Sequence, residues 1–187
     1  MNPTELILLI AAAVLVVIAL ALGKKAGADT RSARLMKKYK TITPEQLDAI
    51  PDGELVDAVV CRILARTDEH RPDPTVTLAS LERGSTVVYS VWVVCKEMAS
   101  GDFHTLMTTA SAAMVEPAIG NLRLLGADRC ADALEQLWQT RNDGTDQTDA
   151  ETAFRQAVQT EQPLGLCEEY IRTNPEEFTD AVSADGE

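Results

Sequence analysis

Residues 86–95 read TVVYSVWVVC, and the way this stretch folds decides the class of the whole protein. Its β-branched and aromatic residues are typical of a β-strand. The neighbouring segments, LASLER before it and CKEMAS after it, instead favour a helix, and the rest of the chain offers no second strand. Because a lone strand would leave its backbone amide and carbonyl groups unpaired, we expect a buried central helix and an all-α fold.

Helical signals extend in both directions from this central segment. The apolar residues of 55–64 recur at i, i+3 and i+4, whereas Asp57, Arg62 and Arg66 fall on the opposite, polar face. A short turn opens at Thr43 and Pro44. Further helices are expected over 118–125, 129–140, 151–160, 163–173 and 176–182, with Pro117, Asp128, Pro163 and Asn174 at their starts and Gly126 as a C-terminal cap.

The stretch MASGDFHTLM, residues 98–107, interrupts this succession of helices. Gly101 can adopt the positive φ that ends a helix, and Asp102 can accept the first amide hydrogens of the next helix. Phe103 is then placed to enter the core. We therefore interpret this stretch as a structural corner between two helices.

Few residues have catalytic or metal-binding potential. The chain lacks the motifs GxxxxGK[ST], GxGxxG, HExxH and GxSxG, so we expect no catalytic residue, no cofactor and no metal. A solvated or structural role is expected for His104, because the only other histidine is His70 and no nucleophile is tied to either by spacing. An enzyme with a site formed by Asp102, His104 and Glu97 is an alternative. The acids of 143–151 do not follow EF-hand spacing.

The four cysteines are scattered along the chain and form no CxxC pair. Each lies among apolar neighbours, which indicates reduced thiols in the core and argues against a disulfide framework or a zinc site. They are Cys61, Cys95, Cys130 and Cys167.

An unbroken apolar run, LILLIAAAVLVVIALAL, occupies residues 6–22. A helix of this length rises about 26 Å, which is at the short end of what spans the hydrocarbon core of a bilayer. A cleaved signal peptide is the alternative, since Ala19 and Ala21 form a small-x-small pattern, but no Lys or Arg precedes the run. We therefore expect an uncleaved transmembrane anchor over residues 1–23.

A basic segment, residues 24–42, follows the expected anchor. By the positive-inside rule its cations orient a single-pass protein of the cell membrane, with the N-terminus outside and the following domain in the cytoplasm. The same charges favour adhesion to anionic lipid. They are Lys24, Lys25, Arg31, Arg34, Lys37, Lys38 and Lys40.

The remainder of the chain is strongly acidic. Residues 41–187 carry 10 Lys and Arg against 27 Asp and Glu, a formal charge of −17. Direct binding of nucleic acid is not expected, because it requires cations on one face, whereas a basic protein partner is favoured. We expect one acidic α-helical domain over residues 43–183 and a disordered tail over residues 184–187.

Four segments resemble a known family in their order and spacing: IPDGELVDAVV at 50–60, STVVYSVWVVCKEMASGDFHTLM at 85–107, LRLLGADRCADALEQLW at 122–138 and EEYIRTNPEEF at 168–178. This family is the DNA-mimic-protein-like domain, a bacterial α-helical domain. Its corner usually reads Asn-Gly-Gly-Phe-x-Gln, of which Gly101 and Phe103 are kept here. The resemblance implies an all-α fold and an acidic surface that imitates DNA phosphates to occupy a DNA-binding protein.

The sequence as a whole predicts a membrane-anchored, cytoplasm-facing helical domain that binds a basic protein through its acidic surface. One alternative is a structural scaffold that packs against a membrane protein, which would require an exposed apolar patch. The other is the enzyme with a site near Asp102 and His104. The oligomeric state is left open.

Overall fold

The computed structural model describes residues 33–67, 81–144 and 146–180. The chain divides into two compact units, Met1–Lys38 and Tyr39–Glu187. In the first unit, the described residues 33–38 form a helical segment. Within the described ranges no helix combines the length and the apolar character needed to cross a bilayer, and the anchor expected at residues 6–22 lies outside these ranges.

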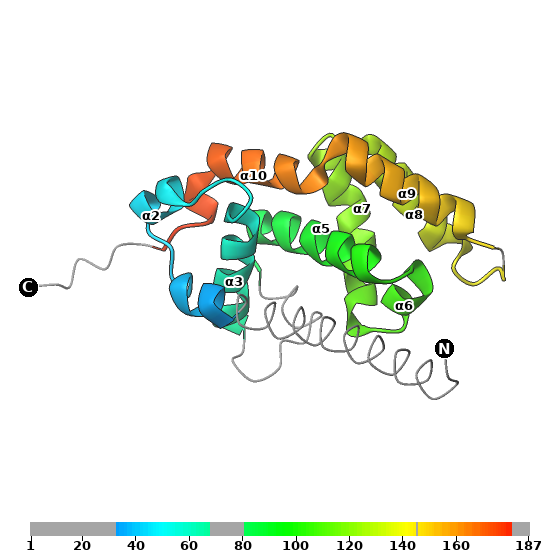
Figure 1. Ribbon diagram of the computed structural model, residues 1–187, viewed down its shortest axis with the longest axis horizontal. Helices are drawn as coiled ribbons and strands as arrows, with labels where there is room; N and C mark the ends of the chain where they lie inside the picture. Colours follow the sequence, from blue (N-terminus) through cyan, green and yellow to red (C-terminus); the bar gives the residue numbers. More distant parts are fainter. Residues whose placement is uncertain (1–32, 68–80, 145, 181–187) are drawn as a thin grey trace, which may run out of the picture. The chain divides into compact units, whose positions relative to one another are not determined.

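Every regular element in the described ranges is helical, which confirms the all-α fold (Figure 1). The longer helices are α3 (Leu55–Thr67), α5 (Arg83–Ser100), α7 (Val115–Leu124), α8 (Asp128–Thr140), α9 (Thr148–Glu161) and α10 (Pro163–Thr173). The shorter elements are α2 (Pro44–Ala49), α6 (Phe103–Met107) and the 3-10 helices η1 (Ala110–Met114) and η2 (Pro175–Glu177).

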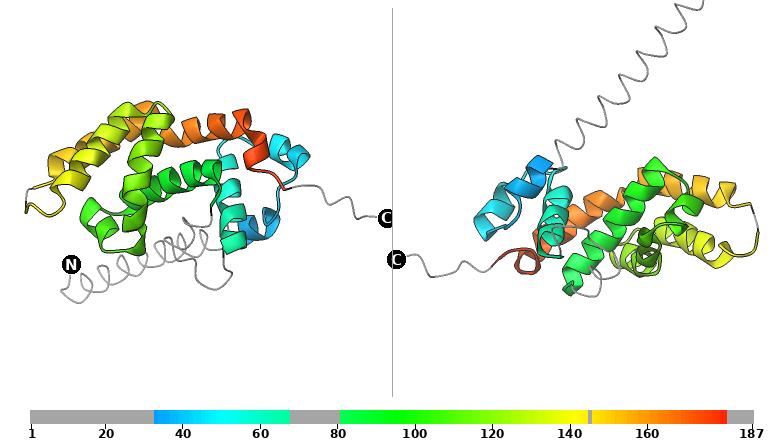
Figure 2. Two further views of the ribbon diagram at one scale, coloured as in Figure 1. Left: turned by 180° about the vertical axis from the view of Figure 1, so that it is seen from behind. Right: turned by 90° about the horizontal axis from the view of Figure 1, so that it is seen from below.

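Helix α5 contains the segment TVVYSVWVVC and forms the centre of the second unit. Most of its side chains are buried, among them Val87, Val88, Val91 and Val94. Burial of one valine side chain stabilises a fold by about 1.5 kcal/mol, which exceeds the roughly 0.5 kcal/mol by which valine disfavours a helix. Because α3, α7 and α10 pack around α5, tertiary burial overrides its strand propensity (Figures 1 and 2).

The predicted glycine cap of α7 is confirmed. Gly126 has φ +83°, and its N–H donates to the carbonyl of Arg123 at 3.0 Å. The N–H of Ala127 donates to the carbonyl of Leu122 at 2.8 Å. This pair of bonds is a Schellman motif, which favours glycine at the left-handed position.

The predicted cap of α8 is wrong. Asp128 is the first residue of the helix and makes no side-chain cap bond. Instead, the carboxylate of Glu161 at the end of α9 accepts from the N–H groups of Arg129 and Cys130, at 3.0 and 2.9 Å. Burial acts to raise the pKa of Glu161, but these hydrogen bonds outweigh it and lower the pKa. The cap therefore joins two neighbouring helices, α8 and α9.

The corner between α5 and α6 is confirmed in its main features. Asp102 accepts a hydrogen bond from the N–H of Thr105 at 2.7 Å, and Phe103 is buried. The expected positive φ of Gly101 is wrong. Its φ is −141°, because the chain passes directly from the last turn of α5 into the extended cap residue Asp102. A β-carbon at Gly101 would meet its nearest atoms at 3.5 Å, an ordinary contact.

The prediction of a helix over residues 176–182 is wrong for residues 176–180, the part that the structure describes. Only the short η2 forms, and Asn174 provides no side-chain cap for it. Phe178 follows η2, is fully buried, and packs edge-on against Tyr170 with ring centroids 6.1 Å apart. Placing this ring in the core turns the chain away from a continuing helix.

A set of hydrogen bonds, the Asp180 clasp, joins Asp180 to Ile42, Arg62 and Arg66. The N–H of Asp180 donates to the carbonyl of Ile42, and the N–H of Ile42 donates to the Asp180 carboxylate, both at 2.8 Å. The Arg62 guanidinium donates to the same carboxylate at 3.1 to 3.3 Å. The expectation that Arg62 lies on a polar face is wrong, because this pairing allows its side chain to be only 3% exposed.

The second unit begins before residue 43. Tyr39 and Ile42 are both buried, and the O–H of Tyr39 donates to the carboxylate of Glu54 at 2.7 Å. Residues 39–42 thus contribute to the core of the second unit.

All four cysteines are free and buried, as the sequence predicts. Burial raises the pKa of Cys61 to about 11 and that of Cys95 to about 12. It also raises the pKa values of Cys130 and Cys167. Because the thiolate is the reactive form, these groups are poor nucleophiles at neutral pH.

Candidate functional site

Most of the described Lys and Arg side chains of the second unit have partners within that unit. The ion pairs join Arg62 and Arg66 to Asp180, Lys96 to Asp57, Arg123 to Asp132 and Glu135, Arg155 to Glu151, and Arg172 to Asp52. Arg141 instead lies over the ring of Trp138, with its guanidinium carbon 3.8 Å from the ring centroid. Each of these cations thus lies next to a carboxylate or an aromatic ring of its own unit, which makes it less available to carboxylates elsewhere on the surface.

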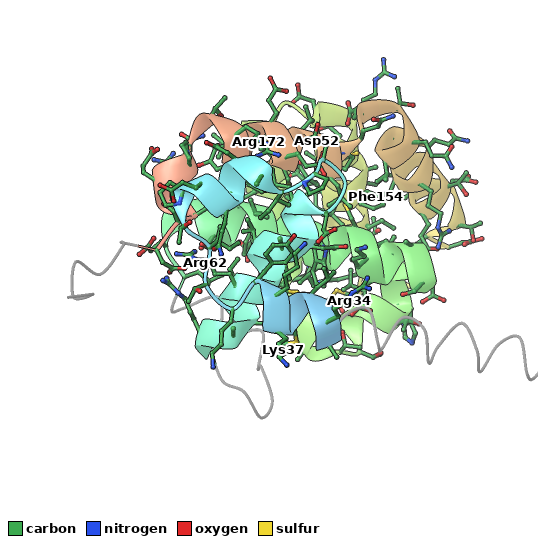
Figure 3. The ribbon with its side chains drawn as sticks, turned by 60° about the vertical axis from the view of Figure 1, so that its left-hand side comes forward. Arg34, Lys37, Asp52, Arg62, Phe154 and Arg172 are labelled. Atoms are coloured by element: carbon green, nitrogen blue, oxygen red, sulfur yellow. The ribbon has the colours of Figure 1, made fainter. Side chains whose placement is uncertain are left out.

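Arg172 shows this structural use of charge most clearly. Its guanidinium donates to the carbonyls of Leu47 and Ile50, at 2.7 and 2.6 Å, and to the Asp52 carboxylate at 3.2 Å. Figure 3 shows Arg172 on α10 close to Asp52, which follows α2. The arginine thereby satisfies the carbonyls at the end of α2, and these donors are not free for other carboxylates.

Exposed carboxylates are carried by the three helical elements that meet at this end of the second unit. We define the α10-end cluster as Asp48 of α2, Glu169 of α10 and Glu176 of η2. All three residues are exposed, and none forms an ion pair with another residue of the described ranges. The helices that carry them meet at one end of the unit, where η2 contacts both α2 and α10 (Figure 1).

A second group of acids lies at the opposite end of the unit, where α8 is joined to α9 (Figure 1). We define the α8–α9 loop cluster as Asp143, Asp146 and Asp149, all exposed. The carboxylate of Asp146 accepts from the O–H and N–H of Thr148, at 2.6 and 3.0 Å, and these bonds lower its pKa. No group of acidic, histidine or cysteine side chains in the described ranges is arranged to hold a metal ion.

A polar hollow of about 450 Å³ lies between the α5–α6 corner and the α8–α9 loop. Its lining includes Asp102 and His104 from the corner, together with Arg141, Asp146 and Glu151. All three of its acids already make hydrogen bonds within the fold. Asp102 caps α6, Glu151 accepts from the N–H of Phe103 at 3.0 Å, and Asp146 accepts from Thr148. The hollow is an open surface feature of mixed charge.

The groups of the hollow do not have the properties of a catalytic pair. Asp102 and His104 are both exposed, and the hydrogen bond from the N–H of Thr105 lowers the pKa of Asp102. A general acid at neutral pH requires the opposite shift, which burial would supply. Glu97 does not line the hollow and lies within 3.5 Å of the Ser111 hydroxyl instead. The enzyme hypothesis therefore gains no support from this region.

Apolar surface is limited in the part of the chain that the structure describes. The exposed large hydrophobic residues there are Met36 and Leu124, which are 38% and 51% exposed. A groove of about 210 Å³ between α5 and α9, lined in part by Met98 and Phe154, is below the size of typical small-molecule sites. The scaffold hypothesis, which calls for a large apolar patch, gains no support here.

The predicted basic cluster is described only in its second half. Arg34, Lys37 and Lys38 lie in the helical segment 33–38, Lys40 follows it, and all four are exposed. Lys24, Lys25 and Arg31 lie outside the described ranges.

The residues that sequence reasoning missed are those that act over long distances along the chain. Glu161 and Asp180 bind groups at least 31 residues away, and neither position carries a local signal for this role. One signal was present for Arg62, because it interrupts the apolar run VVCRIL at residues 59–64. A charged residue between apolar neighbours on a buried helix needs a partner of opposite charge.

Comparisons of the chain with protein-family models, with curated proteins and with solved structures found no match. The resemblance to the DNA-mimic-protein-like domain therefore stays a prediction.

Proposed function

We propose that this protein is anchored in the cell membrane by residues 6–22 and presents a helical domain to the cytoplasm that binds a basic protein. One observation carries the proposal: the cations of the second unit are largely used within it, whereas the carboxylates of the α10-end cluster are exposed without ion-pair partners among the described residues. Residues 41–187 as a whole carry a formal charge of −17, which also favours a positively charged partner.

Electrostatic complementarity would govern this binding. A single exposed ion pair contributes about 0.2 to 1 kcal/mol, so neutralising the three carboxylates of the α10-end cluster should cost about 1 to 2 kcal/mol of binding. A field of one sign also accelerates encounter with a partner of the other sign, and salt weakens that effect. Anchoring would confine the complex to the membrane surface and raise the local concentration for a second contact.

A DNA-binding protein is the partner class that we favour within this proposal. Such a protein presents Lys and Arg at positions that match phosphates, and carboxylates on separate helices can pair with the same cations. Because both ligands would use one surface of the partner, duplex DNA should compete with this protein for it. The resemblance to the DNA-mimic-protein-like domain and the net negative charge of residues 41–187 support this partner class.

The proposal is tested by capture of proteins on the full-length chain in phosphatidylcholine nanodiscs, followed by mass spectrometry. Two variants of equal charge change are compared, Asp48→Asn/Glu169→Gln/Glu176→Gln in the α10-end cluster and Asp143→Asn/Asp146→Asn/Asp149→Asn in the α8–α9 loop cluster. We expect the wild type and the loop variant to capture basic proteins to the same extent and the α10-end variant to capture clearly less of them, and we expect duplex DNA to displace them. Capture of the same proteins in equal amounts by all three chains would contradict the proposal.

A further inference from the structure

The helical segment 33–38 has a basic face. Arg34, Lys37 and Lys38 occupy positions i, i+3 and i+4, which lie within an arc of about 100° on a helix. All three side chains are exposed. Figure 3 shows Lys37 extending away from the ribbon. We call these three residues the juxtamembrane basic face.

We propose that the juxtamembrane basic face binds the headgroups of an anionic bilayer, so that this segment lies on the membrane surface. The inference rests on the proposed anchor at residues 6–22 and deepens it, because the anchor alone requires no particular lipid. The face is 12 residues or more beyond the end of the apolar run, so it is not part of the span itself. The anchor alone therefore does not hold this face against the bilayer, whereas attraction between its cations and anionic headgroups would do so.

Charge complementarity selects an anionic surface as the ligand. Each Lys or Arg near such a surface favours the membrane-bound state over the free state by about five-fold. Two cations together favour it by about 30-fold. Residues 41–187 carry a charge of −17 and are repelled by the same surface. Lipid contact is thus confined to the basic part of the chain.

The experiment uses the full-length chain in two kinds of nanodisc, one of phosphatidylcholine alone and one with about one third phosphatidylglycerol. Trypsin cleavage after Lys38 is timed by mass spectrometry and normalised to cleavage after Arg141, an exposed residue in the turn that follows α8. We expect the anionic discs to slow cleavage after Lys38 by about ten-fold or more, and about 0.5 M NaCl to remove the difference.

Two variants separate the basic face from charge in general. Arg34→Gln/Lys37→Gln retains the Lys38 site and should lose most of the protection. Arg83→Gln/Arg129→Gln removes two exposed cations of the second unit and should retain it. Equal cleavage rates in the two kinds of disc, or equal protection in both variants, would overturn the inference.

Incorporation into nanodiscs, measured first by size-exclusion chromatography, distinguishes this inference from the proposed anchor. A chain that does not incorporate contradicts the anchor. In that case the basic face is tested by co-sedimentation of the same chain with phosphatidylglycerol vesicles. Co-sedimentation of the wild type, but not of Arg34→Gln/Lys37→Gln, would support the inference. A wild type that does not co-sediment would overturn it.

Discussion

Replacement of Asp180 by asparagine should destabilise the second unit through the arginine that it leaves behind. Asparagine has nearly the same shape as aspartate, and its side-chain oxygen can still accept from the N–H of Ile42. The substitution removes the negative charge, and it replaces the oxygen that accepts from the end of the Arg62 guanidinium by an NH2 group, which can only donate. Arg62 then keeps a full positive charge in a position where its side chain is 3% exposed.

The size of the effect follows from the exposure of the groups. Removing one partner of a buried ion pair costs about 3 to 5 kcal/mol, because the other charge is left uncompensated. Asp180 is 17% exposed, so water can reach its edge, and we expect a value near the lower end, about 3 kcal/mol. For a domain of this size that corresponds to a fall in melting temperature of about 10 °C.

The same carboxylate offers a matched control. Arg66 also pairs with Asp180, but its side chain is 51% exposed, so Arg66→Gln should cost only about 0 to 1 kcal/mol. The double variant Arg62→Met/Asp180→Asn removes both buried charges and should recover most of the stability that Asp180→Asn loses. Non-additivity of this kind identifies the pair itself as the source of the effect.

Thermal unfolding of the full chain in detergent micelles provides the assay. Tryptophan fluorescence reports on the second unit, because the two tryptophans of the chain, Trp92 and Trp138, lie in α5 and α8. Equal losses for Asp180→Asn and Arg66→Gln, or a double variant no more stable than Asp180→Asn, would refute the reasoning about the buried charge.

The other predictions concern local features of the same fold. Glu161→Gln should destabilise the protein by about 1 kcal/mol at pH 7 through loss of a charged cap. The folded pKa of Glu161 is lowered from 4.5, so the stability difference between the two chains should be complete above pH 4.5 and vanish as the pH falls through the folded pKa. Urea titrations at several pH values measure this difference, and a difference that does not change with pH would argue against the cap. Gly126→Ala should cost about 1 to 2 kcal/mol because of its positive φ, whereas Gly101→Ala should change stability by no more than about 0.5 kcal/mol, and equal melting temperatures would contradict this contrast. The four thiols should resist a water-soluble disulfide reagent at pH 8 until the chain is unfolded, and rapid modification of the native protein would show that they are not buried.

Features with local causes were predictable from the sequence. The helix over residues 83–100 follows from its flanking helix formers and from the lack of a strand partner, and the cap by Asp102 acts over three residues. The Schellman turn at Gly126 is also local, because glycine is the residue that adopts φ +83° without strain.

Features set by tertiary contact were not predictable in this way. Asp128 has the right residue type for a cap, but Glu161 from the neighbouring helix occupies that role. The end of the described chain forms the Asp180 clasp in place of a helix, since burying Phe178 fixes the path of the backbone. The composition shows the net negative charge of the acidic surface. It does not show which carboxylates lack ion-pair partners, because that depends on which cations pair within the fold.

The most direct test of the acidic binding surface is the salt dependence of binding to the most strongly captured basic protein. The dissociation constant is measured by biolayer interferometry from about 0.05 to 0.5 M NaCl, for the full-length wild type and for Asp48→Asn/Glu169→Gln/Glu176→Gln. We predict that salt weakens wild-type binding by at least about ten-fold, and that the variant binds about 5- to 30-fold more weakly at low salt with a shallower salt dependence. Equal dissociation constants for the two chains, unchanged by salt, would contradict the claim that the α10-end cluster binds the partner.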